Sequence, residues 1–250
     1  MKLALVTGGF RRIGAAIAAR LASEGWALAL HSHRTAAPEA DLALMLASTN
    51  CQWSGFIADL VERESALVLL DDIIAHFGAP PSLIVNNASR FVYDDVATIN
   101  AASIAESLAV NLTAPVLLTT ELAARLPEGD NACVINILDQ RIRQPNGDQL
   151  SYTLSKQALA AATETLARTL APHIRVNGIA PGLTLPTDDY RPAQMVALAN
   201  AMPLRLLPEP EDIADAVIWL ANARATTGQI VFVDGGAALK SFERDFVFMA

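Results

Sequence analysis

Leu3-Ala4-Leu5-Val6-Thr7-Gly8-Gly9-Phe10-Arg11-Arg12-Ile13-Gly14 is an apolar run that leads into a glycine-rich turn, and an amphipathic segment follows it directly. A strand, a glycine turn and a helix in this order leave the first amides of the helix free to face a phosphate group. The same turn can also be plain punctuation between two elements. As a dinucleotide-binding turn it would offer four contacts: Gly8, Arg11, Arg12 and Ile13.

The rest of the 250-residue chain alternates short β-branched runs with longer amphipathic segments. This alternation is typical of a parallel sheet with helices on both faces. The sequence therefore predicts one α/β domain of the Rossmann type, a doubly wound parallel sheet of about seven strands. The expected strands are Leu3–Thr7, Ala27–His31, Cys51–Ile57, Ser82–Asn86, Cys133–Leu138, Ile174–Ile179 and Ile230–Val233. The expected helices are Ile13–Ser23, Leu60–Phe77, Ser103–Arg125, Tyr152–Ala171 and Ile213–Ala221.

Composition argues against several classes of protein. A net charge of −8 disfavours a nucleic-acid surface. The apolar residues are spread over many short runs, so we expect no membrane span. The chain begins directly with a strand, which leaves no room for a signal peptide and predicts a cytoplasmic protein. Cys51 and Cys133 lie far apart without partner ligands, so no metal site is expected.

The end of the second expected strand predicts which dinucleotide is bound. An acidic residue usually binds the ribose 2′-hydroxyl of NADH at this point, whereas a basic residue neutralises the 2′-phosphate of NADPH. Here the sequence has no acid and reads His31-Ser32-His33-Arg34-Thr35. The alternative is a solvated loop arginine. We expect His33, Arg34 and Thr35 to converge with Arg11, so NADPH is favoured over NADH.

Tyr152 and Lys156 are the strongest catalytic candidates. Their spacing of four residues places a phenol and an ammonium group on one helix face, with Cβ atoms about 5–6 Å apart. The ammonium group is expected to lower the phenol pKa, so that Tyr152 exchanges a proton near neutral pH. Such a pair is common by chance, and its context decides its meaning.

That context resembles the short-chain dehydrogenase/reductase family from residue 2 to about residue 236. The turn at residues 7–14 matches the family's Thr-Gly-x-x-x-Gly-x-Gly loop, except that Arg12 replaces the middle glycine. The other matching motifs are Val85-Asn86-Asn87-Ala88, Asn111, the Tyr152/Lys156 pair, Arg175 to Gly182, Thr227-Gly228-Gln229 and Val233-Asp234-Gly235-Gly236.

The resemblance implies further roles. Asp59 and Leu60 would hold the adenine, although Asp59 could equally cap a helix. Lys156 would also hold the nicotinamide ribose, and Asn111 would interrupt its helix and relay protons to Lys156 through a water. The remaining cofactor contacts implied are Asn87, Ala88, Ser89, Tyr152, Pro181 and Gly182.

Asp139 departs from the family, which usually has serine there to bind a substrate carbonyl. An ionised carboxylate only accepts hydrogen bonds and would repel a developing alkoxide. It suits a substrate with N–H donors or a ring nitrogen to be protonated, and burial can make a carboxyl a usable acid. Alternatively, Asp139 merely caps the end of a strand.

Together the departures resemble one branch of the family, the pteridine reductases and the dihydromonapterin and dihydrofolate reductases. The matching features are Arg12 in the loop, His31 to Arg34, Asn87 to Phe91, and Asp139. By resemblance Phe91 stacks a pterin against the nicotinamide. The implied substrate contacts are Arg12, Ser89, Phe91, Asp139 and Tyr152, and the implied catalytic residues are Asp139, Tyr152, Lys156 and Asn111.

The sequence thus favours an NADPH-dependent reductase of a pterin-like or folate-like small molecule, in which Asp139, Tyr152 or a water protonates the reduced C=N nitrogen. A broader carbonyl or 3-oxoacyl reductase is the alternative, and a non-catalytic NADPH-binding regulatory protein is a third. Residues 1–90 would mainly bind NADPH and residues 91–250 would mainly carry catalysis. Pro181–Pro210 would form a mobile substrate loop. The apolar tail at 242–249 suggests docking on a neighbouring subunit, and the family resemblance implies a homotetramer.

Overall fold

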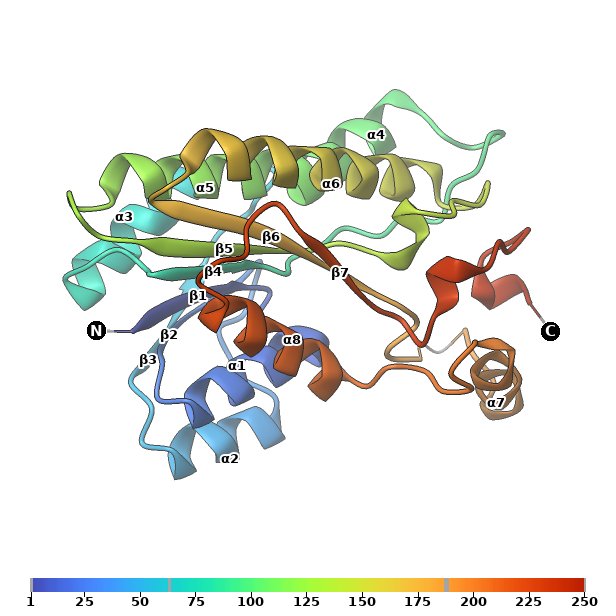
Figure 1. Ribbon diagram of the computed structural model, residues 1–250, viewed down its shortest axis with the longest axis horizontal. Coiled ribbons are helices and arrows are strands. Elements are labelled where there is room, and N and C mark those ends of the chain that lie inside the picture. Colours follow the sequence, from blue (N-terminus) through green and yellow to red (C-terminus); the bar gives the residue numbers. More distant parts are fainter. Residues whose placement is uncertain (1, 63, 187–188, 250) are drawn as a thin grey trace.

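Seven parallel strands form the sheet of the computed structural model, which describes residues 2–62, 64–186 and 189–249 (Figure 1). The strand order is β3-β2-β1-β4-β5-β6-β7, so the chain reverses direction across the sheet between β1 and β4. In this fold ligands bind at the carboxyl ends of the strands beside that reversal. The strands are β1 (Leu3–Thr7), β2 (Ala27–Ser32), β3 (Trp53–Ile57), β4 (Leu83–Asn86), β5 (Ala132–Ile137), β6 (Ile174–Pro181) and β7 (Ile230–Val233).

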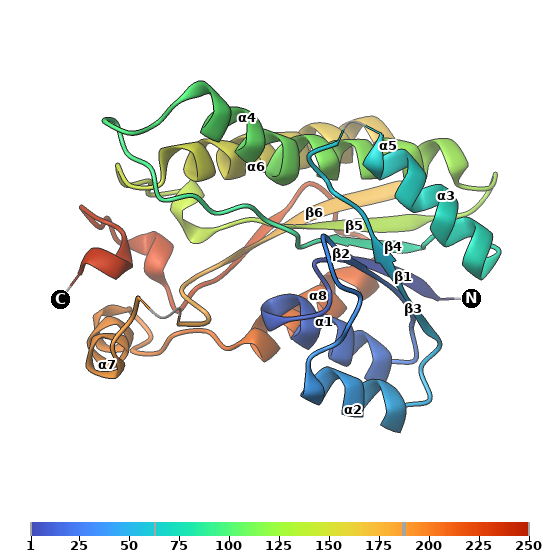
Figure 2. The same cartoon turned by 180° about the vertical axis from the view of Figure 1, so that it is seen from behind.

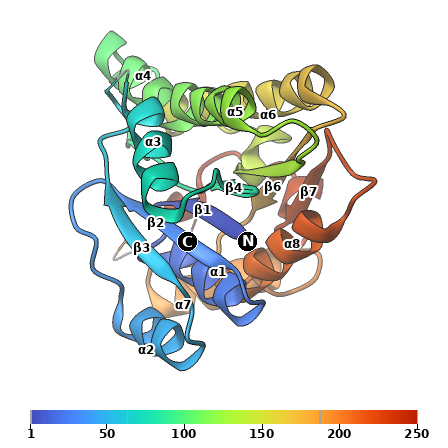
Figure 3. The same ribbon diagram turned by 90° about the vertical axis from the view of Figure 1, so that its left-hand side faces the viewer.

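Helices cover both faces of the sheet, and the end-on view in Figure 3 separates the two layers. One layer holds α3 (Ser65–Phe77), α4 (Ala101–Leu108), α5 (Ala114–Arg125) and α6 (Leu150–Leu170). The other holds α1 (Arg12–Ser23), α2 (Ala40–Ser48) and α8 (Pro210–Asn222). The short helix α7 (Pro192–Ala201) lies beyond the carboxyl ends of the strands, beside the C-terminal segment (Figures 1 and 2). The expected doubly wound fold is confirmed.

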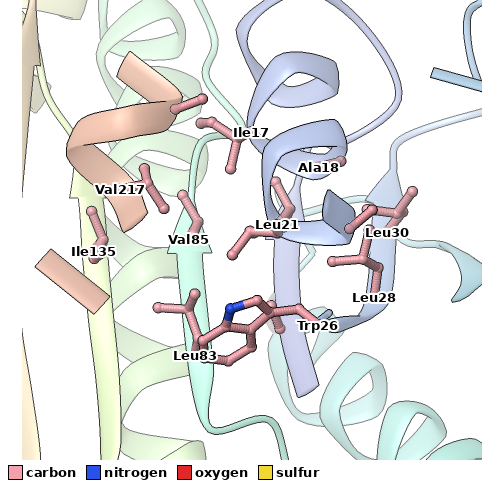
Figure 4. Packing of buried hydrophobic residues seen from close by; sticks show 14 of the residues in the cluster. Ile17, Ala18, Leu21, Trp26, Leu28, Leu30, Leu83, Val85, Ile135 and Val217 are labelled. Atoms are coloured by element: carbon pink, nitrogen blue, oxygen red, sulfur yellow. The ribbon is translucent and has the colours of Figure 1, made fainter. Parts of the chain in front are cut away.

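The central strand β1 shows why the fold forms. Its residues alternate between the two layers, with Ala4 and Val6 in the core under α1 and α8, and Leu3 and Leu5 in the core under α3 and α5. All four are fully buried. A parallel strand covered on both faces needs such a continuous apolar run, and each fully buried leucine contributes about 1.5–3 kcal/mol. Figure 4 shows the first of these cores, where Leu21 of α1 packs close to Val85 of β4.

Several boundaries differ from the sequence-based expectation. The third strand begins at Trp53 rather than Cys51, and β6 continues to Pro181. Helices α2 and α7 were not predicted, and α7 lies inside the stretch expected to be irregular. Thr187 and Asp188 of that stretch lie outside the described residues. Helix α3 begins at Ser65 rather than Leu60, because the Asp59 carboxylate accepts a hydrogen bond from the Val61 amide and closes a turn first.

One continuous helical run, Ala101–Arg125, is long and apolar enough to cross a membrane by length and composition, with a mean hydropathy of 1.5. One helix of this kind is weak evidence, because core helices of globular domains pass the same test. Leu118 and Leu122 of this run are fully buried in the core beneath the sheet. The expectation that the chain has no membrane span stays a prediction.

Candidate functional site

The glycine turn has the shape that a phosphate group requires. Gly8 has a left-handed backbone, with φ of 63°. A Cβ on Gly14 would lie 2.1 Å from the Gly8 carbonyl oxygen, so only glycine lets α1 start this close to the turn. The first turn of α1 has no acidic residue, and its N-cap residue, Arg11, makes no side-chain capping bond. The N-terminus of α1, which its own N-cap side chain leaves uncapped, therefore fits the pyrophosphate of a dinucleotide.

Arg12 has a backbone conformation that favours glycine. Its φ is 55°, in the left-handed region that costs a non-glycine residue about 1–2 kcal/mol. The strain places an exposed guanidinium at the start of α1. The Arg12 amide donates to the Glu39 carboxylate at 3.3 Å, so this amide can donate a hydrogen bond to an anionic group.

The turn is fastened to β4 from one side. The Thr7 hydroxyl oxygen accepts hydrogen bonds from the Asn87 and Ala88 amides, both at 2.9 Å. The Asn87 side chain donates to the carbonyls of Thr7 and Gly8 at 2.9 and 3.2 Å. Asn87 and Ala88 were predicted as cofactor contacts, and here they also hold the turn in place.

His31 fastens the turn from the other side, a role that the sequence did not suggest. This histidine is 2% exposed, and its Nδ1 atom accepts a hydrogen bond from the Gly8 amide at 3.3 Å. Its Nε2 atom lies 3.0 Å from the Ala58 carbonyl, so it carries the proton and donates. Burial lowers the pKa of His31, in keeping with a neutral ring. The ring joins the phosphate turn to the end of β3.

Three of the expected 2′-phosphate contacts follow the carboxyl end of β2, and the fourth, Arg11, directly precedes α1. His33, Arg34 and Thr35 are all exposed, as is Arg11. His33 lies 3.3 Å from the Asp59 carboxylate. Among the described residues neither Arg34 nor Arg11 forms an ion pair, so both guanidinium groups are available to an anion. Leu60, the other expected adenine contact, is buried in the turn after Asp59.

Asn111 lies in a π-helical turn, η1 (Ala109–Thr113), which interrupts the helix as the resemblance implied. Its amide nitrogen donates to the Arg90 carbonyl and to the Ser155 hydroxyl, at 2.8 and 2.9 Å. Its oxygen accepts from the Arg90 amide and the Ser89 hydroxyl. Asn111 thus binds the segment after β4 to α6, next to Lys156. The proton relay through a water stays a prediction.

The predicted catalytic side chains meet beyond the end of β5. Asp139 follows that strand and begins a short 3-10 helix, η2 (Gln140–Ile142). The Tyr152 hydroxyl, from the first turn of α6, donates to the Asp139 carboxylate at 2.9 Å. The Lys156 ammonium group donates to the Ile137 carbonyl at 2.7 Å and lies 5.7 Å from the centre of the Tyr152 ring. The structure therefore brings Asp139, Tyr152 and Lys156 together.

One expectation about this pair is wrong. Burial and the Asp139 carboxylate raise the pKa of Tyr152 well above its usual value, so the phenol keeps its proton at neutral pH. Burial also lowers the pKa of Lys156, to about 8. The prediction took account of the Lys156 ammonium group alone. The Asp139 carboxylate, which accepts a hydrogen bond from the Tyr152 hydroxyl, has the larger effect on the pKa of Tyr152.

Aromatic rings form the open side of this site. Phe91 is 45% exposed, and its ring meets the Tyr152 ring edge to face with 4.8 Å between centroids. Tyr93 packs edge to face on Phe91 at 5.2 Å and donates to the Asp189 carboxylate at 2.7 Å. A flat, partly exposed ring beside a proton donor suits stacking with a planar heterocycle.

Two other predicted contacts lie at the end of β6. Pro181 pairs with Val233 of β7, and the Gly182 amide donates to the Val233 carbonyl. A Cβ on Gly182 would lie 2.8 Å from the Asp234 Cα, so these two backbone segments pass too closely for a side chain at residue 182. Both predicted residues thus lie at the ligand-binding edge of the sheet.

A buried arginine at the centre of the site was not predicted from the sequence. Arg141 is 6% exposed, and its Nε atom donates to Asp139 at 3.2 Å. Its other nitrogens donate to Gln149 at 2.9 Å and to Asp245 at 2.6 Å. Burial alone would lower its pKa, but the carboxylates of Asp139 and Asp245 raise it above the usual value. The sequence shows that Arg141 follows two residues after Asp139. It does not show that Gln149 and Asp245 accept hydrogen bonds from the same guanidinium group.

Comparison with known proteins identifies the family. The family model described as enoyl-(acyl carrier protein) reductase matches residues 9–238. Pteridine reductase 1 of Leishmania tarentolae is 31% identical over 282 residues, covering 95% of this chain and 96% of that protein. The chain therefore belongs to the short-chain dehydrogenase/reductase family.

Further similarities show the branch that the chain resembles. FolM alternative dihydrofolate reductase 1 from Brucella canis, whose crystal structure is complexed with NADP, gives a TM-score of 0.83 at 38% identity, covering 97% of this chain and 96% of that one. Together with the pteridine reductase, it confirms the expected likeness to the pteridine and dihydrofolate reductase branch. The (3R)-3-hydroxyacyl-CoA dehydrogenase of Mus musculus is also 34% identical over 247 residues, covering 94% of this chain and 95% of that protein.

Proposed function

We propose that this oxidoreductase uses NADPH to reduce a C=N bond in a pterin-like ring, of the dihydropterin or dihydrofolate type. The observation that carries the proposal is the 2.9 Å hydrogen bond from the Tyr152 hydroxyl to the carboxylate of Asp139, at the position where most of the family has serine. A carboxylate there can accept N–H groups of a heterocycle, and it disfavours the alkoxide formed in ketone reduction.

Cofactor choice rests on charge. NADPH, when bound, supplies the hydride. The N-terminus of α1 would hold its pyrophosphate, and the exposed cations Arg11 and Arg34 would neutralise its 2′-phosphate. The NADP in the Brucella canis relative supports this choice. Lys156 would hold the nicotinamide ribose hydroxyls.

The protein's own groups would manage the substrate and the proton. Phe91 offers a face for stacking, and Asp139 would orient ring N–H groups. Tyr152 keeps its proton at neutral pH, because burial and Asp139 raise its pKa. It would donate that proton to the ring nitrogen as the adjacent carbon is reduced. The nearby cations of Lys156 and Arg141 would then stabilise the phenolate.

A second candidate is a carbonyl or 3-oxoacyl reductase, which the similarity to (3R)-3-hydroxyacyl-CoA dehydrogenase favours. One experiment separates the two proposals. NADPH oxidation is measured with dihydropterins, quinonoid dihydropterin, dihydrofolate, a simple ketone and a 3-oxoacyl thioester. The pterin proposal expects the highest kcat/KM with a pterin or a folate. It is refuted if every pterin and folate is ignored while a ketone or thioester is reduced efficiently.

Two proposals concern the setting of the enzyme. We propose that it works in the cytoplasm, and that it forms a homotetramer, as the family resemblance implies. Sedimentation of the purified protein tests the assembly, and fractionation of the source cells tests the location.

A further inference from the structure

The C-terminal segment, Arg244–Met249, folds back over the carboxyl ends of the strands, beside α7 (Figures 1 and 2). The sequence suggested that this tail docks on a neighbouring subunit. Within its own chain Phe246 is 6% exposed and packs in a small core with Leu198 and Met202, and docking on a neighbouring subunit stays a prediction. Phe248, two residues further on, is 53% exposed to solvent. The segment is therefore part of the same domain as the site.

Two anchors hold the segment in place. The Asp148 carboxylate, just before α6, accepts hydrogen bonds from the Asp245 amide at 2.7 Å and from the Arg244 side chain at 2.8 Å. From the other side the Gln194 side chain of α7 donates to three carbonyls of the tail. These belong to Phe246, Val247 and Met249, at 3.0, 3.1 and 2.7 Å.

The anchored segment presents one carboxylate to the catalytic centre. Asp245 is 4% exposed and accepts from the Arg141 guanidinium. The remaining nitrogens of that guanidinium donate to Asp139 and to Gln149, so each of its three nitrogens has an acceptor from a different part of the chain. The group also lies over the Tyr152 ring, 5.3 Å from the centroid. Because all three nitrogens of the planar Arg141 guanidinium donate hydrogen bonds, its orientation towards Asp139 is fixed.

We propose that the C-terminal segment is a part of the active site, in which Asp245 acts through Arg141 as a positioning residue for Asp139 and Tyr152. This inference rests on the proposed catalytic roles of those two residues. It adds a function for a segment that lies beyond the family motifs and beyond the region matched by the family model.

The proposal has an electrostatic consequence. Tyr152 faces Asp139 after β5, Arg141 in η2, Asp245 in the tail and Lys156 on its own helix. Charged or titratable groups one layer further out are Asp148, Asp189, Tyr190 and Arg244. Burial, Asp139 and Asp245 raise the pKa of Tyr152, whereas Arg141 lowers it. Removing the charge of Asp245 should therefore lower the pKa of Tyr152, and removing the charge of Arg141 should raise it.

Asp245→Asn is the decisive variant, because asparagine keeps an oxygen for the Val247 amide, while an uncharged NH2 group, which only donates, replaces the carboxylate oxygen that accepts from Arg141. Activity is assayed with whichever substrate of the panel turns over fastest. We expect kcat to fall about tenfold while the KM for NADPH stays unchanged, and the alkaline limb of the kcat profile to move to lower pH. Arg141→Gln should move that limb to higher pH. Asp245→Glu should restore most of kcat.

Glu243→Gln is the matched control, because it removes the same charge from an exposed position two residues earlier in the tail. It should leave kcat and the pH profile unchanged. If Asp245→Asn does not fold, Gln194→Met decides, because it releases the tail without changing a charge and should reproduce both the lower kcat and the shifted limb.

The outcomes separate this inference from the proposed function. If Asp245→Asn keeps its kcat within twofold and its alkaline limb in place, or loses activity no more than Glu243→Gln, the tail has no part in the site. If Tyr152→Phe retains full turnover, the catalytic assignment fails first, and the inference falls with it. Inactive Tyr152→Phe beside unaffected Asp245→Asn refutes only the inference.

Discussion

Replacing Asp139 by serine gives the site the arrangement that most of the family has. The Asp139 carboxylate accepts three hydrogen bonds, from the Tyr152 hydroxyl, the Arg141 amide and the Arg141 side chain. A serine hydroxyl is shorter and uncharged, and its single oxygen cannot accept all three. It can also donate to a carbonyl oxygen, which an ionised carboxylate cannot do. Pterin reduction and ketone reduction should therefore respond in opposite directions.

The magnitude follows from burial. The side chains of Arg141 and Asp139 are 7% and 18% exposed, so solvent screens their pairing little. A hydrogen bond to a charged group contributes about 1.5–3 kcal/mol, or roughly a 10- to 100-fold loss of kcat/KM if the bond supports the pterin transition state. Arg141 keeps Asp245 and Gln149 as acceptors. The protein should therefore stay folded, with a loss of stability of about 1–3 kcal/mol, or several degrees in Tm.

The assay compares kcat/KM of Asp139→Ser for a dihydropterin and for a simple ketone, both with NADPH. Asp130→Ser is the control, because it makes the same chemical change in the exposed turn before β5. We expect dihydropterin reduction to fall while ketone reduction is unchanged or improved. Dihydropterin reduction at the unmodified rate by Asp139→Ser would refute the role assigned to the carboxylate.

Four other outcomes test the remaining parts of the site. Arg34→Ala should raise the KM for NADPH roughly tenfold and leave the KM for NADH nearly unchanged, and equal use of both cofactors by the unmodified enzyme would refute the assignment. Tyr152→Phe should lower kcat about 10²–10⁴-fold while the Kd of NADPH measured by fluorescence stays the same. Phe91→Ala should raise the pterin KM several-fold, because stacking contributes about 0.5–1.5 kcal/mol beyond the buried area. Burial lowers the pKa of His31 below its ordinary 6.5, so the unfolded chain binds the proton more readily and stability is lost as the pH falls from 6.5 towards the folded pKa. A Tm of His31→Asn that declines in this range as steeply as that of the unmodified protein would contradict this.

The sequence predicted the sheet well, because each strand carries its own signal. Leu3–Thr7 and Ile230–Val233 were predicted with their observed bounds. A strand buried on both faces must be apolar throughout, whatever its neighbours are. The start of α3 was predicted five residues too early, since the apolar spacing continues through a turn that Asp59 closes with its side chain. Side-chain bonds to the backbone of this kind are not visible in hydrophobic periodicity.

The site was predicted as far as local motifs reach. Asp139, Tyr152 and Lys156 were expected together, because each follows a recognisable strand or lies on one helix face, and the structure joins them. The raised pKa of Tyr152 and the presence of Arg141 were missed. Both depend on which groups meet after folding, and the Arg141–Asp245 pair joins residues 104 positions apart in the chain. No spacing rule covers such a pair.

Backbone strain links the two halves of the site. Arg12 and Gln149 are two of the four non-glycine residues with positive φ among those that the structure describes, at 55° and 48°. Glycine would relax either backbone, saving about 1–2 kcal/mol. At Arg12 it would remove a guanidinium from the phosphate turn, and at Gln149 it would remove the oxygen that accepts from Arg141. At each place the strained backbone carries a side chain with a predicted or observed part in the site: the Arg12 guanidinium is predicted to contact the cofactor phosphate, and the Gln149 oxygen holds the arginine that donates to Asp139.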